Sequence, residues 1–562
     1  MKQKLVIIGG VAAGATAAAR ARRLDEEVDI TLVERGPYVS YANCGLPYFL
    51  SRDIEKRSKL LLQTPEGFDA RYGVRVLVNT EVTAIDRASK RVLLRGKDGE
   101  TGETELAYDR LILAQGGNPV MPPMEGGNAA HVFRLWTVPD MDRLHDYLNK
   151  LDKAKPCTAV VVGGGFIGLE MAEAFAKRGL KVTVVEMLPT VMATMDREFG
   201  VAIAGELTRQ GVEVITGSQV VRVSGSEEQN QIALADGRSI DADVVLFSVG
   251  VRAELTLAKQ AGLLLGASGG LLVDEYLRTS DPDIFAAGDM VEVKHRVSSR
   301  MVRIPLAGPA NRQGRIAASN ALGMEMHYGG ALGTSVVKVF DATAAMTGLS
   351  EKVAREAGFN VGVAIIVKEH HAGYYPGAKE MTLKLVYDRS NARLLGGQAF
   401  GVEGVEKRID VLATALAGNM TLNDLAELDL AYAPPYSSAN DPVNLAAFVG
   451  LNDISKASPL VTAAELKAEL ASAQPPLVLD VRGLGEFEQG HLQGAKHIPV
   501  DELRFELDAL PRDRRLAVYC RSGFRGHLAL RILRGHGFTD VVNVTGGYLS
   551  VAAEGGLALE RT

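Results

Sequence analysis

Two of the three cysteines lie in loops whose neighbouring residues suit sulfur chemistry. Cys44 stands in the segment SYANCGLPY at residues 40–48, and Cys520 opens the segment CRSGFR at residues 520–525. Neither thiol has a second cysteine nearby, so neither loop contains the C-x-x-C or C-x4-C pair of an enzyme that makes and breaks its own disulfide. We therefore expect each thiol to react with a sulfur brought from outside or from the other loop.

The segment before Cys44 is typical of a strand–turn–helix that binds a dinucleotide. Residues 5–8 predict a buried strand, 9–14 a glycine turn, 15–24 a helix and 28–33 a second strand that ends at Glu34. Such a turn places a pyrophosphate on a helix N-terminus, and an acidic residue about 20 positions on binds a ribose hydroxyl. Val11 replaces the middle glycine of G-x-G-x-x-G, so an ordinary βαβ turn stays an alternative here.

A second turn, GGGFIG at residues 163–168, contains all three glycines of the pattern. It follows an apolar strand at 159–162 and precedes a helix and a strand that ends at Glu186. A carboxylate at this position binds a ribose 2′-hydroxyl and repels a 2′-phosphate, which favours NADH over NADPH.

Two further segments complete a larger pattern: a strand and crossover at residues 108–116, and a late strand at 279–289 that ends in Gly288-Asp289. Together with the two turns, they resemble the two-dinucleotide-binding-domain flavoprotein family, which binds FAD in its first domain and NAD(P)H in its second. By this resemblance Asp289 holds the FAD ribityl chain and Glu34 the adenosine ribose. The cofactor residues so implied are Gly9, Gly10, Ala13, Gly14, Glu34, Arg35, Ala114, Gly116, Gly163, Gly165, Phe166, Ile167, Gly168, Glu186, Gly250, Gly288 and Asp289.

Length and composition describe an ordinary globular protein of several domains. A chain of 562 residues predicts about three to four domains, and the net charge of −6 gives no reason to expect a nucleic-acid partner. Three cysteines exclude a disulfide scaffold and suit a reducing compartment. No apolar run approaches the roughly 20 residues needed to span a bilayer, and the N-terminus predicts a strand rather than a signal peptide. We expect a cytoplasmic protein with no membrane partner and no metal site.

The loop around Cys44 resembles the single-cysteine branch of the flavin disulfide reductases. Reductases of the glutathione-reductase kind carry a C-x4-C pair at this point, whereas Val39 and Phe49 stand at those spacings here. The single-cysteine branch contains CoA-disulfide reductase, NADH peroxidase and NADH oxidase. In it, the cysteine alternates between a thiolate and either a mixed disulfide or a sulfenic acid.

Several residues match the CoA-disulfide-reductase pattern within that branch. They are Thr16, Arg20 and Arg23 on the first helix, with Ser40 and Asn43 in the cysteine loop. A guanidinium binds phosphate in a bidentate way, so the two arginines suit a phosphate of CoA. A solvated helix face is the plainer alternative for them.

The chain also departs from that pattern. Asn311 and Asn440 stand where the CoA-disulfide reductases carry cationic or His side chains, and Arg71 is expected to replace one lost cation. CoA is therefore expected as a ligand, although the physiological substrate need not be the symmetric disulfide.

Two tyrosine-rich strings, GYYPG at 373–377 and LAYAPPY at 430–436, also resemble CoA-disulfide reductases. In those enzymes tyrosines of the partner subunit approach the cysteine and the departing thiolate, and Tyr374 and Tyr432 match them best by spacing. A phenol can donate a hydrogen bond or a proton to that thiolate. A tyrosine packed in a subunit interface is the alternative for each. The resemblance implies a homodimer.

The C-terminal segment closely resembles a rhodanese domain, through PLVLDVR at 476–482, GHL at 490–492, GAKHIP at 494–499 and the Cys520 loop. In a rhodanese loop, backbone N–H groups form an anion nest at a helix N-terminus, which lowers the thiol pKa and stabilises a persulfide. Arg521 and Arg525 are expected to add positive potential. A C-x5-R phosphatase loop is the alternative, which the upstream strings disfavour. The loop residues are Arg521, Ser522, Gly523, Phe524 and Arg525.

The whole pattern predicts an α/β protein with two Rossmann-like dinucleotide-binding domains, an α+β dimerisation domain and a C-terminal rhodanese α/β domain. The expected limits are 1–120 with 250–325 for the FAD-binding domain, 121–249 for the NADH-binding domain, 326–450 for the dimerisation domain, 451–459 for a linker and 460–562 for the rhodanese domain.

Over nearly its whole length the chain resembles a CoA-disulfide reductase–rhodanese fusion, the group that includes NADH-dependent persulfide reductases. This resemblance implies that NADH, through FAD, reduces Cys44, which attacks CoA persulfide, polysulfide or CoA disulfide. Cys520 would carry sulfane sulfur, and CoA would be the bound substrate or an arm between the thiols. Two alternatives stay open: an NADH peroxidase or oxidase that uses a Cys44 sulfenic acid, and a non-catalytic sulfur carrier or redox sensor.

Overall fold

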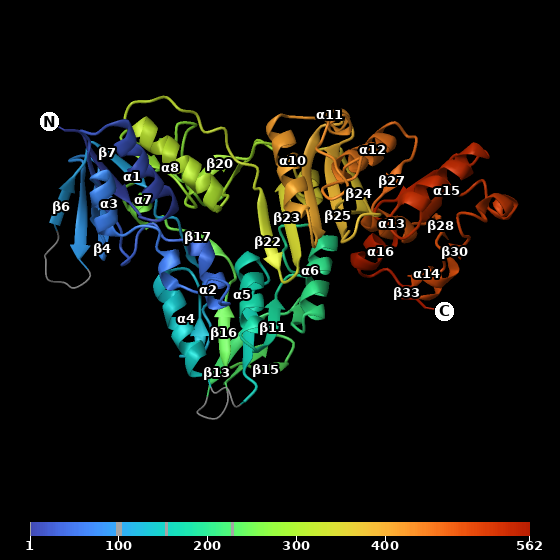
Figure 1. The fold of residues 1–562 in the computed structure, drawn as a ribbon, viewed down its shortest axis with the longest axis horizontal. Coiled ribbons are helices and arrows are strands. Elements are labelled where there is room, and N and C mark those ends of the chain that lie inside the picture. The colour runs from blue at the N-terminus through green and yellow to red at the C-terminus, as the bar shows by residue number, and fades with distance from the viewer. Residues whose placement is uncertain (1, 97–103, 152–154, 226–229, 562) are drawn as a thin grey trace. The chain divides into compact units, whose positions relative to one another are not determined.

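The computed structural model describes residues 2–96, 104–151, 155–225 and 230–561. These residues form two compact units, one of Met1–Pro189 with Gly211–Gly333, and the other of Thr190–Gln210 with Thr334–Thr562. Figure 1 labels their helices and strands. No described helix is long and apolar enough to cross a membrane.

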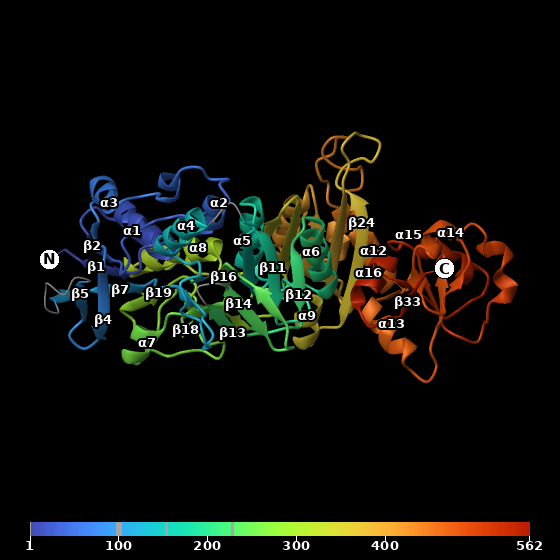
Figure 2. The ribbon, with the colours of Figure 1, turned by 90° about the horizontal axis from the view of Figure 1, so that it is seen from below.

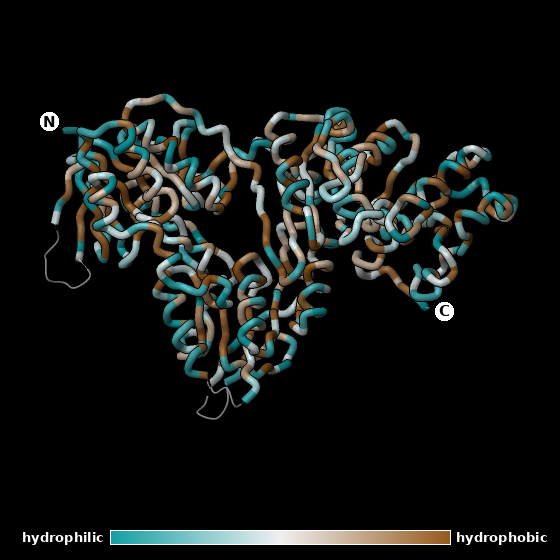
Figure 3. The backbone as a smooth tube through the Cα atoms, viewed as in Figure 1, coloured by the Kyte–Doolittle hydropathy of each residue, from teal (hydrophilic) through white to brown (hydrophobic). Residues whose placement is uncertain are grey.

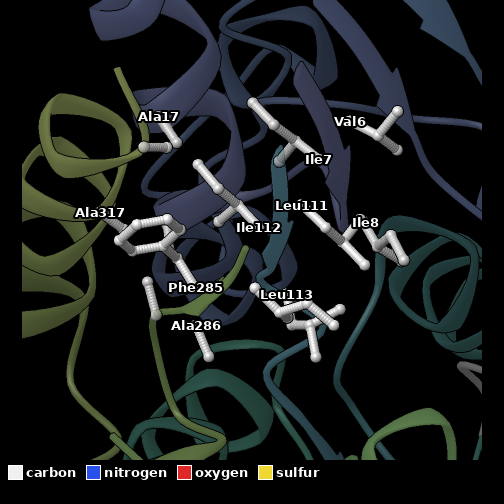
Figure 4. Close-up of a cluster of buried hydrophobic side chains, with 14 of the residues drawn as sticks. Val6, Ile7, Ile8, Ala17, Leu111, Ile112, Leu113, Phe285, Ala286 and Ala317 are labelled. Atoms are coloured by element: carbon white, nitrogen blue, oxygen red, sulfur yellow. The ribbon is translucent and has the colours of Figure 1, made fainter. Parts of the chain in front are cut away.

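The first sheet of the first unit is parallel, in the strand order β19-β7-β1-β2-β3. Its strands are β1 (Lys4–Ile8), β2 (Asp29–Val33), β3 (Arg75–Leu77), β7 (Arg110–Leu113) and β19 (Ile284–Ala286). Four strands begin with a charged residue, and apart from these and Thr31 the strand residues are apolar, as in sheets covered on both faces. Figure 4 shows side chains of β1, β7 and β19 packed together with Ala17 and Ala317, which come from the two helices on one face.

Those two helices, α1 (Ala12–Leu24) and α8 (Ala307–Ala321), lie side by side in Figure 1 and in Figure 2. They approach so closely that a Cβ added to Gly314 would lie 2.2 Å from the carbonyl oxygen of Ala13. The helix α1 begins at Ala12 rather than at the predicted Ala15. It starts inside the glycine turn because Gly14 allows the helix to reach the turn: a Cβ there would lie 1.7 Å from the oxygen of Gly9.

Smaller elements surround this sheet. The helices are α2 (Leu46–Leu50), α3 (Pro65–Tyr72) and α7 (Thr256–Gln260), with 3-10 turns η1 (Asn43–Gly45) and η2 (Arg57–Leu60). The short sheets are β4 (Thr80–Asp86) with β5 (Arg91–Gly96) and β6 (Thr104–Ala107), and β18 (Leu271–Leu272) with β20 (Val291–Lys294) and β21 (Met301–Val302).

The second sheet of this unit is also parallel and has the order β12-β11-β10-β16-β9. Its strands are β9 (Val132–Phe133), β10 (Thr158–Val162), β11 (Lys181–Glu186), β12 (Glu213–Thr216) and β16 (Val244–Phe247). Further elements are α4 (Val138–Lys150), α5 (Phe166–Lys177), the antiparallel β13 (Val220–Gly225), β14 (Asn230–Leu234) and β15 (Ser239–Asp241), and the pair β8 (Gly117–Pro119) with β17 (Val251–Ala253).

The second unit contains an antiparallel sheet in the order β22-β23-β26-β25-β24. Its strands are β22 (Ser335–Val339), β23 (Ala342–Gly348), β24 (Val361–Glu369), β25 (Glu380–Asp388) and β26 (Leu394–Gly401). The helices packed with it are α6 (Arg197–Arg209), α9 (Glu351–Glu356), α10 (Val405–Ala417), α11 (Leu422–Ala426) and α12 (Pro442–Ile454).

A parallel sheet in the order β27-β32-β31-β28-β30 completes the second unit. Its strands are β27 (Leu460–Val461), β28 (Leu477–Asp480), β30 (Lys496–His497), β31 (Leu516–Tyr519) and β32 (Val541–Val544). Around it lie α13 (Ala463–Leu470), α14 (Leu484–Glu488), α15 (Phe524–Gly535), α16 (Gly547–Glu554), the turns η3 (Leu503–Phe505) and η4 (Leu507–Ala509), and β29 (His491–Leu492) with β33 (Leu559–Glu560).

Residues 451–459 differ from the predicted linker. The helix α12 continues through Ile454, and the Asp453 carboxylate is buried. It accepts hydrogen bonds from Tyr387 Oη at 2.8 Å, Arg389 Nε at 2.7 Å and the Leu460 backbone N–H at 2.9 Å. This carboxylate ties the last sheet to the antiparallel sheet, so the segment is an ordered junction.

The expected fold class is confirmed: two parallel sheets that follow glycine turns, an antiparallel sheet with helices, and a C-terminal parallel sheet. Figure 3 shows the strands as largely brown, hydrophobic segments, with teal, hydrophilic residues mostly on helices and turns.

Candidate functional site

The first glycine turn is shaped by backbone contacts that only glycine permits. Gly9 has φ +100°, and a Cβ there would lie 2.3 Å from the oxygen of Ala114. The Glu34 carboxylate accepts the N–H groups of Gly10 at 2.8 Å and Gly36 at 2.7 Å. The acidic residue at the end of β2 is therefore held against the turn, where a ribose of a bound dinucleotide would meet it.

The second turn repeats this arrangement. Gly163 has φ +103°, and a Cβ on Gly168 would lie 2.0 Å from the oxygen of Gly163. A Cβ on Gly165 would meet nothing within 4 Å, which leaves room for a phosphate beside the backbone. The Glu186 carboxylate accepts from Gly164 N at 2.7 Å and from Leu188 N at 2.8 Å. Phe166 and Ile167 open α5, whose first turn has no acidic residue to repel a phosphate.

Two polar groups near the first turn have no partner within the described residues, which fits a FAD site. Asp289 follows β19, forms no hydrogen bond or ion pair, and burial raises the pKa of its carboxyl to about 6. Gln115 Oε1 is buried without a hydrogen-bond partner in the loop after β7. The Gly288 backbone N–H beside Asp289 donates to Gln313 Oε1 at 2.7 Å.

The structure brings most of the predicted FAD residues to one end of the first sheet. Gly9 meets Ala114, and Ala13 lies next to Gly288, where a Cβ would be 3.4 Å away. Gly116, with φ +64°, directly precedes β8, and Gly250, with φ +111°, directly precedes the paired β17. Arg35 Nη2 donates to Asn118 Oδ1 at 2.8 Å.

Cys44 sits in the 3-10 turn η1, in an exposed position. Ser40 connects this loop to the first glycine turn: its N–H donates to the oxygen of Gly10 at 2.8 Å, and its φ of 45° lies in the left-handed region. The Cys44 thiol donates to Asn43 Oδ1, with the sulfur 3.6 Å from that oxygen. Ser40 and Asn43 therefore both act on the cysteine loop itself.

Two residues at the Cys44 site, Tyr48 and Glu170, were not predicted from the sequence. Partial burial raises the pKa of the Cys44 thiol, and the carboxylates of Glu170 and Asp289 raise it further. Glu170, on α5, accepts a hydrogen bond from Tyr48 Oη at 3.0 Å, and burial raises its pKa to about 7. The available signal was a pair of glutamates, Glu170 and Glu173, within the otherwise apolar run FIGLEMAEAF.

The predicted CoA residues of α1 meet α8. Thr16 Oγ1 donates to Asn311 Oδ1 at 2.7 Å, and Arg20 Nε donates to Ser319 Oγ at 3.1 Å. Burial lowers the pKa of Arg20, and the like charges of Arg315 and Arg23 lower it further.

Arg315 was not predicted, although it follows Asn311 by one helical turn on α8. Among the described residues, neither Arg23 nor Arg315 has a carboxylate partner. Clustered cations without carboxylates favour an anionic ligand. Arg71 is exposed near the end of α3, without an ion pair to a described residue.

In the second unit, the structure brings Tyr374 and Tyr432 together. Their hydroxyl oxygens are 3.2 Å apart, and both side chains are exposed. Asn440 is also exposed and directly precedes Asp441, the N-cap of α12.

A buried ion pair fixes the two tyrosine segments. Arg408 Nη2 donates to Asp441 Oδ2 at 2.8 Å and to the His370 carbonyl at 2.7 Å. Asp441 also accepts from Ser437 Oγ at 2.7 Å, and the Ala372 N–H donates to the Ser437 carbonyl at 3.0 Å. The backbones that lead to both tyrosines are thus joined.

Cys520 follows β31 on the face that also carries Leu516 and Val518, and its side chain is buried. The Gly523 N–H, 3.1 Å from the sulfur, donates to it. Gly523 has φ +115°, and α15 begins at the next residue, Phe524. A thiolate or persulfide here would face a backbone N–H at a helix N-terminus.

The two loop arginines, which were expected to add positive potential, are each paired with a carboxylate. Arg521 forms two hydrogen bonds with Glu380, both of 2.7 Å, and Arg525 forms two with Glu486, of 2.6 and 2.8 Å. Each guanidinium is thus paired with a carboxylate, while Arg525 also interacts with the Cys520 sulfur, and both Glu486 and Cys520 raise the pKa of Arg525.

Family models match most of the chain. Residues 3–314 match the pyridine nucleotide-disulphide oxidoreductase model, and residues 334–442 match the dimerisation domain of the same family. The chain belongs to the pyridine nucleotide-disulphide oxidoreductase family. This family binds FAD and NAD(P)H, in agreement with both glycine turns. Residues 462–554 match a rhodanese-like domain, which disfavours the phosphatase alternative.

Relatives extend the likeness over the whole length of this oxidoreductase. It is 40% identical to the reduced CoADR-RHD of Bacillus anthracis, covers 98% of each chain and superposes with a TM-score of 0.93. It is 38% identical to an NAD-dependent persulfide reductase from A. fulgidus, over 97% of this chain and 99% of that one, with a TM-score of 0.89. A CoA-dependent NAD(P)H sulfur oxidoreductase of Pyrococcus abyssi is 38% identical over 80% of this chain and 98% of its own.

Proposed function

We propose that the protein is an NADH-dependent reductase of CoA persulfide, polysulfide and CoA disulfide, with a sulfurtransferase thiol at Cys520. One observation carries this proposal: a lone thiol, Cys44, follows a FAD-type turn in a chain that is similar from end to end to proteins named for CoA disulfide or persulfide reduction. The domain limits expected from the sequence, apart from the linker at 451–459, and a homodimer are parts of the same proposal.

FAD, when bound, supplies two electrons from NADH to the sulfur bonded to Cys44. Gly9, Gly14, Glu34 and Asp289 would hold that cofactor, as their placement around the first turn allows. Glu186 is proposed to bind the nicotinamide nucleotide through its ribose 2′-hydroxyl and so to prefer NADH.

At Cys44 we propose a thiol–disulfide exchange. The thiolate attacks one sulfur of the substrate S–S bond, a Cys44–S bond forms and the substrate bond breaks. Hydrosulfide or CoA thiolate leaves and takes a proton. Tyr374 and Tyr432, in the partner subunit, are proposed to donate that proton or a hydrogen bond.

The α1–α8 face is proposed to bind the phosphates of CoA. Arg20, Arg23 and Arg315 gather there, and Thr16 and Asn311 join the two helices beside them. Ser40, Asn43, Arg71 and Asn440 complete the proposed CoA residues. This grouping favours a ligand site over a merely solvated helix face, because like charges repel unless an anion lies between them.

The deciding measurement is anaerobic NADH oxidation by the full-length protein with CoA persulfide and with CoA disulfide. Wild type, Cys44→Ser and Cys520→Ser are compared, with hydrogen peroxide and oxygen as further oxidants. We expect turnover with CoA persulfide that Cys44→Ser abolishes and Cys520→Ser leaves in place when free persulfide is supplied. Turnover with peroxide or oxygen but with neither sulfur substrate would overturn the proposal in favour of a peroxidase or oxidase.

A further inference from the structure

Two glutamates face each other at the end of the β24–β25 hairpin. Glu369 ends β24, Glu380 begins β25, and the antiparallel register places them directly opposite one another. Like charges at such a position destabilise a sheet unless a cation lies with them. This local conflict marks a site where the hairpin receives a positively charged group.

The cation that Glu380 receives comes from the rhodanese-like domain. Arg521 donates from both Nη atoms to the two carboxylate oxygens of Glu380, at 2.7 Å each. Lys368 forms an ion pair with Glu369 at 3.0 Å. A bidentate pair of this kind uses one N–H of each Nη atom and orients the guanidinium toward Glu380.

Arg521 directly follows Cys520 in the sequence. Its ion pair with Glu380 therefore determines whether its guanidinium is available to a molecule that binds at Cys520. The other arginine of the loop, Arg525, is paired with Glu486 in the same way. An incoming sulfur donor therefore finds the Gly523 N–H and Arg525 near the sulfur, while the guanidinium of Arg521 is directed toward Glu380.

Sulfur donors differ in how much they need such a cation. Thiosulfate is a dianion, and its leaving group, sulfite, also carries charge. A persulfide R–S–SH is neutral at its S–S bond, and its leaving thiolate R–S⁻ has no oxygen atoms for a guanidinium to bind. A free arginine beside the cysteine would favour thiosulfate, because guanidinium binds sulfonate oxygens as it binds phosphate and carboxylate.

We propose that Glu380 sets the donor preference of Cys520: it withholds Arg521 from the oxygen atoms of thiosulfate and sulfite, so that Cys520 takes sulfur from persulfides in preference to thiosulfate. The inference rests on the proposed function of Cys520 as a sulfur carrier and adds a specificity-determining residue from another domain.

Both transfers are balanced without any further oxidant. With a persulfide R–S–SH, the Cys520 thiolate attacks the terminal sulfur, the R–S bond to that sulfur breaks, and Cys520–S–SH and R–S⁻ result. With thiosulfate, the thiolate attacks the outer sulfur, the S–S bond breaks, and Cys520–S–S⁻ and sulfite result. Either way Cys520 gains one sulfur atom.

The test measures sulfur loading of Cys520 in the full-length protein, as the mass increase of one sulfur atom on its peptide. Glutathione persulfide and thiosulfate serve as the two donors. The variants are Glu380→Gln, Arg521→Gln, the double variant, and Glu427→Gln as a matched charge-neutralising control. Glu427 is the C-cap residue of α11. The N-cap residue of that helix, Thr421, forms an isolated β-bridge with Arg393, which lies near the other end of β25.

We expect Glu380→Gln to raise the ratio of thiosulfate to persulfide loading rates by about threefold to tenfold, as one freed guanidinium would. Arg521→Gln should cancel this gain in the double variant, and Glu427→Gln should leave the ratio unchanged. An unchanged ratio in Glu380→Gln, or an equal rise with both donors, would overturn the inference and leave the proposed function intact. Failure of wild-type Cys520 to accept sulfur from either donor would instead overturn its proposed role as a carrier.

Discussion

Cys44 has two carboxylic acids as neighbours, and both hold their protons to higher pH than exposed carboxylic acids do. Burial raises the pKa of Glu170 to about 7 and that of Asp289 to about 6. Once ionised, they in turn raise the pKa of the Cys44 thiol. The reactivity of this thiol is thus coupled to groups that titrate close to neutral pH.

Glu170→Gln should lower the pKa of Cys44, because a negative charge near the thiolate is removed. Above about pH 7, where the wild-type carboxyl ionises, we expect alkylation of Cys44 by iodoacetamide in the reduced protein to become roughly twofold to fivefold faster. Below that pH wild type and variant should react alike, because Glu170 is then neutral. The measurement is the alkylation rate of Cys44 from pH 6 to about 9.

Glu125→Gln is the control for this prediction, since Glu125 is an exposed glutamate of the same unit. A variant Glu170→Gln that alkylates at the wild-type rate throughout the pH range would show that the Glu170 charge does not act on the thiol.

Site residues that stand inside a sequence motif could be predicted. Site residues that reach the site from a helix or strand without such a motif could not. Cys44, Cys520 and the turn glycines stand in recognisable strings. Tyr48 and Glu170 meet across 122 positions of sequence, and Arg315 reaches the α1 arginines from a helix near the end of the unit. Only the packing of α5 and α8 brings those side chains to the site.

Close packing of α1 against α8 is what aligns the proposed CoA face. Gly314→Ala should push the helices apart, because its Cβ would lie 2.2 Å from a backbone oxygen that cannot move aside. We expect a loss of about 1–3 kcal/mol in unfolding free energy and a higher KM for CoA disulfide. Calorimetry and steady-state kinetics measure the two effects.

Gly205→Ala provides the matched control, since a Cβ at this position of α6 would meet nothing within 4 Å. It should be neutral or should stabilise by up to about 1 kcal/mol, as alanine does in a helix. Equal melting temperatures for Gly314→Ala and wild type would contradict the close-packing argument.

A buried lysine organises the antiparallel sheet. Lys384 on β25 lies 2.8 Å from Asp196, 2.6 Å from Glu198 and 2.9 Å from Glu351. Burial acts to raise the pKa of Asp196, but Lys384 and neighbouring donors hold it below its usual value. A lowered carboxyl pKa stabilises the fold above the unfolded pKa of about 4 and loses this effect as pH falls through the folded value.

Lys384→Met should cost about 3–5 kcal/mol at pH 7, because three carboxylates lose their buried cation. The difference from wild type should narrow toward pH 4, since protonation relieves the variant while it weakens wild type. Calorimetric melting of the full chain at several pH values tests this, with Lys352→Met, an exposed lysine on α9, as control. A difference that stays constant with pH would contradict the electrostatic explanation.

The helices and strands around the motifs could be predicted from sequence patterns. The junction at 451–459 shows where such patterns fail. Polar and small residues there are typical of a linker, yet Asp453 is buried and accepts three hydrogen bonds from separate elements. Composition does not reveal a buried carboxylate whose partners, such as Tyr387, lie far away in sequence.

On the scale of the whole molecule, the proposed homodimer makes a sharp prediction. Cys44→Ser and Tyr432→Phe subunits are coexpressed with different tags, and mixed dimers are isolated. If the tyrosine serves the partner's cysteine, each mixed dimer has one complete site and about half of the wild-type rate with CoA disulfide. If both residues act within one subunit, mixed dimers have no complete site and stay as slow as the separate variants, which would contradict the proposed arrangement.

Three contacts hold the C-terminal sheet to the antiparallel sheet and its helices. Arg521 of the cysteine loop binds Glu380, and the Leu460 N–H of β27 donates to Asp453. The Thr545 hydroxyl accepts the Ile365 N–H at 2.8 Å. These three contacts oppose a movement of the rhodanese-like domain away from the antiparallel sheet. We therefore propose that a diffusible thiol carries sulfur away from Cys520. The rate of sulfur transfer between the two cysteines would then depend on the concentration of that thiol in the cell. The protein would respond to the concentration of the thiol as well as to that of the sulfur donor.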